Sequence, residues 1–156
     1  MSKKNTSPVT VGWREWVALP ELGLPAIKAK IDTGAKTSAL HAFYTDIYEN
    51  DGIKMVKFGI HPIQKNSELI VDCHAPVKDY REISDSGGHK EMRYVIETMM
   101  VIGEHQWPIE MTLTNRDTMR FRMLLGRRAM EQRVIVDPGS SYLNGKLSPH
   151  KHYKIN

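Results

Sequence analysis

The sequence predicts an all-β domain, either a closed barrel or a sandwich. Short apolar or β-branched runs recur along the chain, and turn-forming clusters such as Asn50-Asp51-Gly52 and Ser86-Gly87-Gly88 separate them. Strands of this length and spacing are typical of sandwiches and barrels. Helical periodicity is nearly absent, since only one short helix is expected, around residues 128–132 just after Gly126.

The expected strands follow one another from the N-terminus to the C-terminus. In each, apolar residues alternate or cluster in the manner of a strand with one or two buried faces. The turn Pro20-Glu21-Leu22-Gly23 separates the first two, and Ser38 begins a third after a short loop. The complete set of runs is 11–19, 26–31, 38–40, 53–58, 69–71, 94–102, 107–113, 123–125 and 134–136.

Length and composition indicate one globular domain. The chain has 156 residues, of which 26% are charged and 40% hydrophobic, and at this size roughly two-thirds of the unfolded surface is buried on folding. No repeat, low-complexity tract or Pro/Gly/Ser linker divides it. We expect a folded domain over residues 10–145, a flexible tail over 1–9 and a solvated tail over 146–156.

Cysteine usage and the N-terminal segment bear on the compartment. Cys73 is the one cysteine, which excludes a disulfide framework within the chain and suits a reducing environment. Residues 1–10 are polar and lack the apolar stretch of a signal peptide, and no later run has the length of a membrane-spanning helix. These observations predict a cytoplasmic protein that makes no contact with a membrane.

The chain is mildly basic, with 22 Lys and Arg against 18 Asp and Glu, a formal net charge of +4. Part of the excess is concentrated between residues 116 and 133, where Asp117 and Glu131 are the acidic residues. Two interpretations fit this segment, a solvated edge and a surface that binds anions. The arginines concerned are Arg116, Arg120, Arg122, Arg127, Arg128 and Arg133.

The segment Asp32-Thr33-Gly34 carries the strongest chemical signal. An apolar strand leads into it, so the chain presents a carboxylate at a tight turn. Gly34 allows a close approach of the backbone, and the Thr33 hydroxyl is placed to lock the loop by hydrogen bonding. A carboxylate shared across a two-fold axis has these needs, although the three residues alone also fit an ordinary Asx-turn.

A second segment, Met123-Leu124-Leu125-Gly126-Arg127, is an apolar strand that ends at a Gly-Arg step. The two segments together resemble the two signatures of retropepsin-type aspartic proteases, in which a Leu-Gly-Arg segment passes behind the catalytic loop. The stretches 14–42 and 107–143 look like a narrower bacterial group. This is the retropepsin-like family labelled "ATP-dependent zinc protease" and associated with RimK-type ATP-grasp ligases, and the resemblance spans most of residues 10–145.

The resemblance implies a retropepsin-like barrel that acts as a two-fold homodimer, because each chain supplies one catalytic loop. Its activity would be hydrolysis of peptide bonds by an aspartic dyad and an activated water. The association with amino-acid ligases implies an acidic or ligase-modified tail as a substrate. The resulting assignments are Asp32, Thr33 and Gly34 as catalytic residues, Ala35, Arg116, Arg120 and Arg122 as substrate-binding residues, and Leu125, Gly126 and Arg127 as structural support.

A flexible flap is expected to close the cleft. The candidate is the polar turn containing Ser86, Gly87 and Gly88, because a mobile lid needs a backbone free of bulky packing. The same residues also fit an ordinary hairpin tip.

The family label also mentions zinc and ATP, and the residues support neither. There is no His-Glu-x-x-His motif, and the seven histidines show no paired ligand spacing, although Cys73-His74 remains a weak adventitious site. Gly34-Ala35-Lys36-Thr37 only mimics a phosphate loop, because Ala35 stands where the Walker pattern needs glycine. We therefore expect no metal and no cofactor.

Three other functions remain open. One is a non-catalytic retropepsin-like binding module, the second is a zinc-dependent peptidase, and the third is a nucleic-acid-binding barrel that uses the arginines. Trp13, Trp16 and Trp107 are expected in the core or at a dimer interface rather than as a stacking platform, so nucleic acid is not the expected partner. His41 is expected to be a structural histidine.

Overall fold

The computed structural model describes residues 7–85, 87–115 and 120–155. Within these ranges the chain forms twelve strands, two α-helices and one 3₁₀ turn. Their bounds are β1 (Val9–Val11), β2 (Arg14–Leu19), η1 (Pro20–Leu22), β3 (Leu24–Asp32), β4 (Ser38–His41), β5 (Tyr44–Asn50), β6 (Ile53–Ile60), β7 (Val71–Pro76), β8 (Asp79–Ser84), β9 (Lys90–Ile102), β10 (His105–Thr114), β11 (Met123–Gly126), α1 (Arg127–Met130), β12 (Val134–Val136) and α2 (Pro149–His152).

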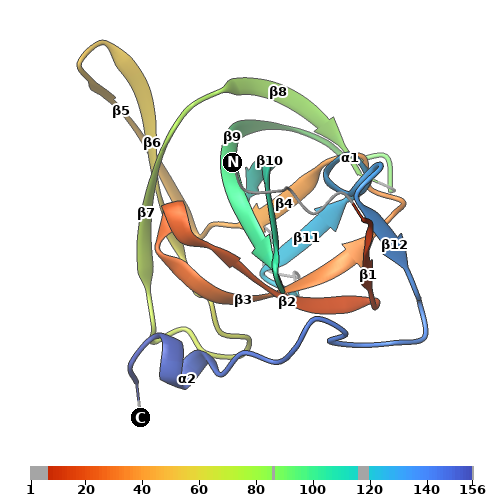
Figure 1. Ribbon diagram of the computed structural model, residues 1–156. Helices are drawn as coiled ribbons and strands as arrows, with labels where there is room; N and C mark the ends of the chain where they lie inside the picture. Colours follow the sequence, from red (N-terminus) through yellow and green to blue (C-terminus); the bar gives the residue numbers. More distant parts are fainter. Residues whose placement is uncertain (1–6, 86, 116–119, 156) are drawn as a thin grey trace, which may run out of the picture.

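The main sheet closes on itself to form a barrel (Figure 1). Its strands run in the order β10-β4-β11-β3-β2-β9-β8, and β9 also pairs with β10, so the ring is complete without β8. The pairs β11–β3 and β10–β4 are parallel, whereas β2–β3, β2–β9 and β9–β10 are antiparallel. The predicted mostly-β fold with a closed ring of strands is confirmed.

The core fills the interior of this ring. Side chains alternate between the interior and the outside, as the burial of every second residue in β2 shows. Leu40, Met111 and Leu125 are fully buried although they come from three different strands. Burial of each such side chain contributes about 1.5–3 kcal/mol, so the ring is held by apolar packing as well as by its backbone ladder.

The predicted strand over residues 11–19 is two strands in the structure. β1 pairs in parallel with β12, whereas β2 joins the barrel. The break falls at Gly12, where a Cβ atom would lie 2.0 Å from the carbonyl oxygen of Ser140. The sequence pattern alone could not reveal this close crossing of two distant segments.

Two strands were not predicted from the sequence. β5 forms an antiparallel sheet with β6 and β7, and the β5–β6 hairpin projects from the barrel (Figure 1). β8 pairs with β9 outside the closed ring. Both β5 and β8 are half-buried or exposed along their whole length, so they lack the apolar alternation by which buried strands are recognised.

The expectation of one short helix is corrected by α2, a second short helix within the segment expected as a solvated C-terminal tail. Ser148 caps this helix by accepting the Lys151 N–H, and Pro149 occupies its first turn. The Tyr153 hydroxyl then donates to the carbonyl oxygen of Ala26 at 2.7 Å, which ties the C-terminal segment to β3. In the described part of the chain, no helix is both long enough and apolar enough to cross a bilayer.

Candidate active site

Asp32 is the last residue of β3, and its carboxylate organises the loop that follows. Oδ1 accepts the N–H groups of Gly34 at 3.1 Å and Ala35 at 3.2 Å, and the Ala35 N–H also lies 3.3 Å from the Asp32 carbonyl oxygen. Among the described residues no donor bonds Oδ2, so this oxygen can meet a water molecule. Asp32 is half-buried.

The Thr33 hydroxyl is expected to lock the loop by hydrogen bonding, and within the single described chain it does not do so. Its side chain is exposed, and no described residue hydrogen-bonds its hydroxyl. Its carbonyl oxygen instead accepts a hydrogen bond from Arg127 Nη1 at 3.3 Å. The loop is therefore held by the Asp32 carboxylate and by Arg127, and the Thr33 side chain faces outward.

The Leu-Gly-Arg segment lies directly beside this loop. β11 pairs in parallel with β3, so Leu125 lies opposite Ile31 and Gly126 opposite Asp32. A Cβ atom on Gly126 would lie 2.5 Å from the carbonyl carbon of Thr37, which is far inside van der Waals contact. Glycine is required here because the backbone after the Asp32 loop crosses at this point.

Helix α1 continues this support. The Arg127 N–H donates to the Ala35 carbonyl oxygen at 2.7 Å, and the Arg128 N–H donates to the Lys36 carbonyl oxygen at 3.1 Å. The first N–H groups of a helix have no partner within the helix. Here the loop carbonyls satisfy two of them, so the helix start and the Asp32 loop fix each other.

Ser38 supports the site as well, and sequence reasoning noted it only as the start of a strand. It is buried, and its hydroxyl accepts the Gly126 N–H at 3.0 Å. Its carbonyl oxygen accepts the Thr112 hydroxyl at 3.0 Å, and Thr112 in turn accepts Arg93 Nη1 at 3.3 Å. A polar chain thus runs through the barrel wall from β9 to the strand beside Asp32.

The flap candidate is the turn between β8 and β9. Ser86 lies outside the described residues, whereas Gly87 and Gly88 are exposed. Asp85 Oδ1 accepts the N–H groups of Gly87 and His89, each at 2.9 Å, and Gly88 has a φ of 83°. Asp85 thus holds the described residues on the far side of this turn, and among the described residues no hydrogen bond or ion pair joins Gly87, Gly88 or His89 to Asp32.

The described arginines of the segment 116–133 differ in exposure and in their contacts. Arg116 lies outside the described residues, Arg120 is exposed, and the half-buried Arg122 accepts the His41 N–H on its carbonyl oxygen at 2.8 Å. Arg133 stacks over the Trp107 ring with its guanidinium 5.4 Å from the ring centre. The Arg133 side chain therefore contributes to the packing of the fold.

The three tryptophans differ in how deeply they are buried. Trp107 is buried and donates its Nε1–H to the Ala129 carbonyl oxygen at 2.8 Å, as a core residue would. Trp13 is 36% exposed and Trp16 is half-buried, and both lie against cations on the outside of the barrel. The expectation of a core position is met by Trp107 alone.

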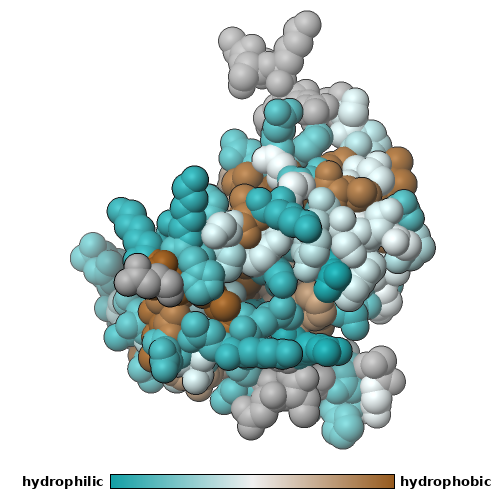
Figure 2. All heavy atoms as spheres, turned by 90° about the horizontal axis from the view of Figure 1, so that it is seen from below, coloured by the Kyte–Doolittle hydropathy of each residue, from teal (hydrophilic) through white to brown (hydrophobic). Residues whose placement is uncertain are grey.

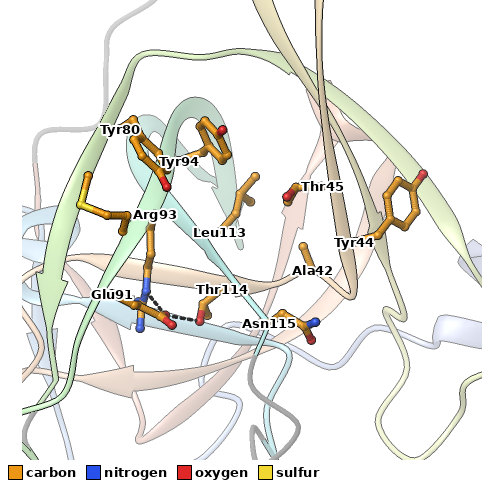
Figure 3. A pocket seen from close by; sticks show the side chains of 11 residues that line it. Ala42, Tyr44, Thr45, Tyr80, Glu91, Arg93, Tyr94, Leu113, Thr114 and Asn115 are labelled. Atoms are coloured by element: carbon orange, nitrogen blue, oxygen red, sulfur yellow. Dashed lines mark hydrogen bonds and ion pairs between the residues drawn. The ribbon is translucent and has the colours of Figure 1, made fainter.

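A cavity of about 280 Å³ is lined by residues of β5, β8, β9 and β10 and of their neighbouring loops (Figure 3). Glu91 accepts hydrogen bonds from Arg93 and from the Thr114 hydroxyl at one wall, and the Tyr80 and Tyr94 rings pack 4.4 Å apart at another. None of the predicted catalytic residues is among its lining residues, which are Ala42, Tyr44, Thr45, Tyr80, Glu91, Met92, Arg93, Tyr94, Leu113, Thr114 and Asn115.

Cys73 and His74 are not arranged as a pair of ligands. Cys73 is buried, and burial, with a smaller contribution from Asp72, raises the pKa of its thiol to about 12. His74 Nδ1 instead lies 2.8 Å from the Tyr48 hydroxyl. Within residues 7–85, 87–115 and 120–155, no three His, Cys, Asp or Glu side chains gather to hold a metal ion.

A closed β-barrel in which a strand ends at Asp-Thr-Gly beside a Leu-Gly-Arg segment is a retropepsin-like domain. Residues 10–147 match the RimB-like family, described as "Retropepsin-like aspartic endopeptidase RimB", and the chain belongs to this family. The resemblance inferred from the motifs is therefore confirmed.

Curated relatives carry the same domain within longer proteins. A "Probable alpha-L-glutamate ligase" of Parasynechococcus marenigrum (strain WH8102) is 48% identical over 142 residues, which is 91% of this chain and 30% of the relative. A protein of the same name from Shewanella halifaxensis (strain HAW-EB4) is 46% identical over 136 residues, or 87% of this chain and 30% of the relative. The chain thus spans about a third of the length of these relatives.

A solved structure shares the fold. The crystal structure of a protein with unknown function (DUF785) from Legionella pneumophila matches with a TM-score of 0.73 and 25% sequence identity. The match covers 88% of this chain and 99% of the other. Its description assigns no activity.

Proposed function

We propose that this protein is an aspartic peptidase that acts as a homodimer. The observation that carries the proposal is the state of Asp32, whose Oδ1 is held by two loop N–H groups and whose Oδ2 is left unbonded by the described residues. Peptide hydrolysis by two carboxylates needs a second such group. A second copy of the chain would supply it through an isologous, two-fold contact near the loop.

The chemistry follows from placing two carboxylates a few ångströms apart. Two carboxyl groups at this distance cannot both ionise easily, because their negative charges would repel each other, so the pair shares one proton. The ionised Asp32 takes a proton from a water molecule as the water oxygen bonds to the scissile carbonyl carbon, and the protonated Asp32 of the partner subunit donates to the carbonyl oxygen. The tetrahedral intermediate then expels the amine, which receives a proton from the dyad.

The remaining loop residues act by positioning. Gly126 lets the crossing backbone approach, and Arg127 fixes the Thr33 carbonyl oxygen. The exposed Thr33 side chain is free to pack at the two-fold contact. The turn with Gly87 and Gly88 is proposed as the flap, since β8 lies outside the closed ring and, within the described chain, its backbone pairs with β9 alone.

The proposed substrates include an acidic or ligase-modified peptide tail. This follows from the relatives named alpha-L-glutamate ligases, in which the same domain occupies about 30% of the chain. Arg116, Arg120 and Arg122, together with Ala35 of the loop, are the proposed substrate-binding residues, because arginines pair well with carboxylates and these three precede β11, the strand paired with β3, which ends at Asp32. The proposed location is the cytoplasm, because a single cysteine suits a reducing compartment.

Mass spectrometry of peptide digests tests the proposal. Purified wild-type protein is expected to cleave a glutamate-rich peptide, and Asp32→Asn is expected to abolish cleavage while the protein stays folded, because Asn cannot act as a base. Undiminished cleavage by Asp32→Asn would exclude the dyad. Loss of wild-type activity with EDTA and its recovery with Zn²⁺ would favour a zinc peptidase, and tight peptide binding without cleavage would favour a binding module.

A further inference from the structure

A row of cations runs along the outside of the barrel toward Asp32. Residues alternate between the two faces of a strand, and in β3 Lys28, Lys30 and Asp32 share the outer face while Ala29 and Ile31 are buried. On the neighbouring strand β2, Arg14 lies opposite Lys30. Two positive side chains therefore lie next to each other, two residues from the proposed catalytic carboxylate.

Aromatic rings hold part of this row in place. The Arg14 guanidinium lies 4.5 Å from the Trp13 ring centre and 4.8 Å from that of Tyr142. Lys28 Nζ lies 5.2 Å from the Trp16 ring centre and 5.8 Å from that of Tyr142. Rings attract cations through their negative faces without neutralising them, so the positive charges are fixed in position and remain available.

The same cations have no acidic partners. In the described part of the chain, neither Arg14, Lys28 nor Lys30 forms an ion pair with a carboxylate. Glu15 on β2 points into the barrel, where Gly12, Leu143 and Asn144 N–H groups satisfy it. Figure 2 views the molecule from the side of β2, β3 and α2, and hydrophilic side chains spread across much of that face.

The cross-strand pairing of Arg14 with Lys30 destabilises the protein when no ligand is bound. Like charges directly opposite each other on neighbouring strands destabilise a sheet. Lys30 is exposed, and within the described residues no aromatic ring lies over it and no carboxylate forms an ion pair with either cation, so the rings beside Arg14 offset the repulsion only in part. An anion from outside the chain would turn the repulsion into attraction.

We propose that Arg14, Lys28 and Lys30 form a subsite for carboxylate side chains of the substrate, adjacent to Asp32. The proposal rests on the proposed function and specifies which residues select an acidic substrate. Side chains two apart on an extended strand are about 7 Å apart. An extended peptide with acidic side chains at every second position therefore matches the spacing of Lys28 and Lys30.

Binding measurements on the Asp32→Asn protein test the subsite separately from catalysis. The probes are a fluorescently labelled oligoglutamate peptide and an oligoglutamine peptide of the same length. We expect tighter binding of oligoglutamate, and Lys30→Gln and Arg14→Gln should each weaken it about two- to fivefold, the range of an exposed ion pair. Oligoglutamine binding should stay unchanged. Lys54→Gln on the projecting hairpin removes one charge elsewhere and serves as the control.

The outcomes separate the two proposals. Equal affinity for the two peptides, or loss of oligoglutamate binding that Lys54→Gln reproduces, would overturn the subsite. Selective binding by Asp32→Asn together with an inactive wild-type protein would retain the subsite and reject the peptidase. Arg14→Lys keeps the charge and should restore most of the affinity lost in Arg14→Gln, which distinguishes a lost charge from a disturbed strand.

Discussion

The backbone N–H of Gly126 donates to the hydroxyl of Ser38 at 3.0 Å inside the barrel wall. Gly126 lies opposite Asp32 in the parallel ladder of β11 and β3. A buried serine therefore fixes the strand that lies beside the proposed catalytic residue.

Ser38→Ala is predicted to destabilise the protein by about 1–3 kcal/mol, because the buried Gly126 N–H loses its acceptor. Urea denaturation monitored by circular dichroism measures the change in the free energy of unfolding. Ser67→Ala, at an exposed loop position, is the matched control and should have little effect. Equal stability of the two variants would contradict the assigned role of Ser38.

Gly126→Ala is predicted to lower the free energy of unfolding by about 3 kcal/mol, since the added methyl group would meet the Thr37 backbone. Backbone atoms on both sides cannot move aside as a flexible side chain can. Gly139→Ala is the control, because the nearest atom to its Cβ would be Asp137 Oδ1 at 3.7 Å. A thermal melt in which both variants unfold together would argue against the close approach at Gly126.

Arg127→Ala is predicted to cause a clear loss of peptidase activity while changing the free energy of unfolding of the single chain only slightly. Arg127 is half exposed and its bond to the Thr33 carbonyl oxygen is at the surface, so the stability change should be within about 1 kcal/mol. The loop would lose a restraint next to Asp32. Arg128→Ala, from the same helix, should retain activity, and kcat/KM values for the two variants give the comparison.

Stability is predicted to fall steadily as the pH rises from about 9 to about 12. The pKa of the Cys73 thiol is raised from 9.0 to about 12, mainly by burial. Burial likewise raises the pKa of Tyr153 to about 12, and the hydrogen bond to Asp72 does so for Tyr44. In each case the group loses its proton at a lower pH in the unfolded chain than in the folded one. Its contribution to the free energy of unfolding is therefore fully present below the pKa of the unfolded chain and is lost as the pH rises to the pKa of the folded chain.

Unfolding free energies measured in urea at several pH values test this dependence. Cys73→Ala should flatten the pH dependence above about pH 9, after allowance for its lower stability at neutral pH. An unchanged slope would mean that Cys73 titrates alike in the folded and unfolded chains. The native thiol should also react slowly with a disulfide reagent at neutral pH, because the thiolate is the reactive form.

The sequence predicted the barrel through its buried strands and the site through two local motifs. Strands such as β9 and β10 carry apolar alternation because the ring buries one face of each. β5 and β8 were missed because they lie largely outside the core and show no such pattern. The α2 helix was missed because its docking depends on a contact between Tyr153 and Ala26, which no local pattern reveals.

Parts of the site were also beyond sequence reasoning, for a related reason. The partners of Asp32 within the loop are local, so the Asp-Thr-Gly motif revealed them. Ser38 and Thr112 support the site through bonds to strands far away in the chain. Within the arginine cluster, Arg127 holds the Thr33 carbonyl oxygen, in keeping with its expected supporting role, and Arg133 packs on Trp107, a long-range contact that no local pattern reveals.

The central claim is that one active site needs Asp32 from two chains, and a subunit-mixing experiment tests it directly. Wild-type and Asp32→Asn proteins are mixed in equal amounts at a fixed total concentration, equilibrated and assayed on a glutamate-rich peptide. If every site needs two intact carboxylates, random pairing leaves about one quarter of the activity of pure wild-type protein at that concentration. Activity of about one half would mean that each chain works independently of its partner, which would contradict the shared dyad.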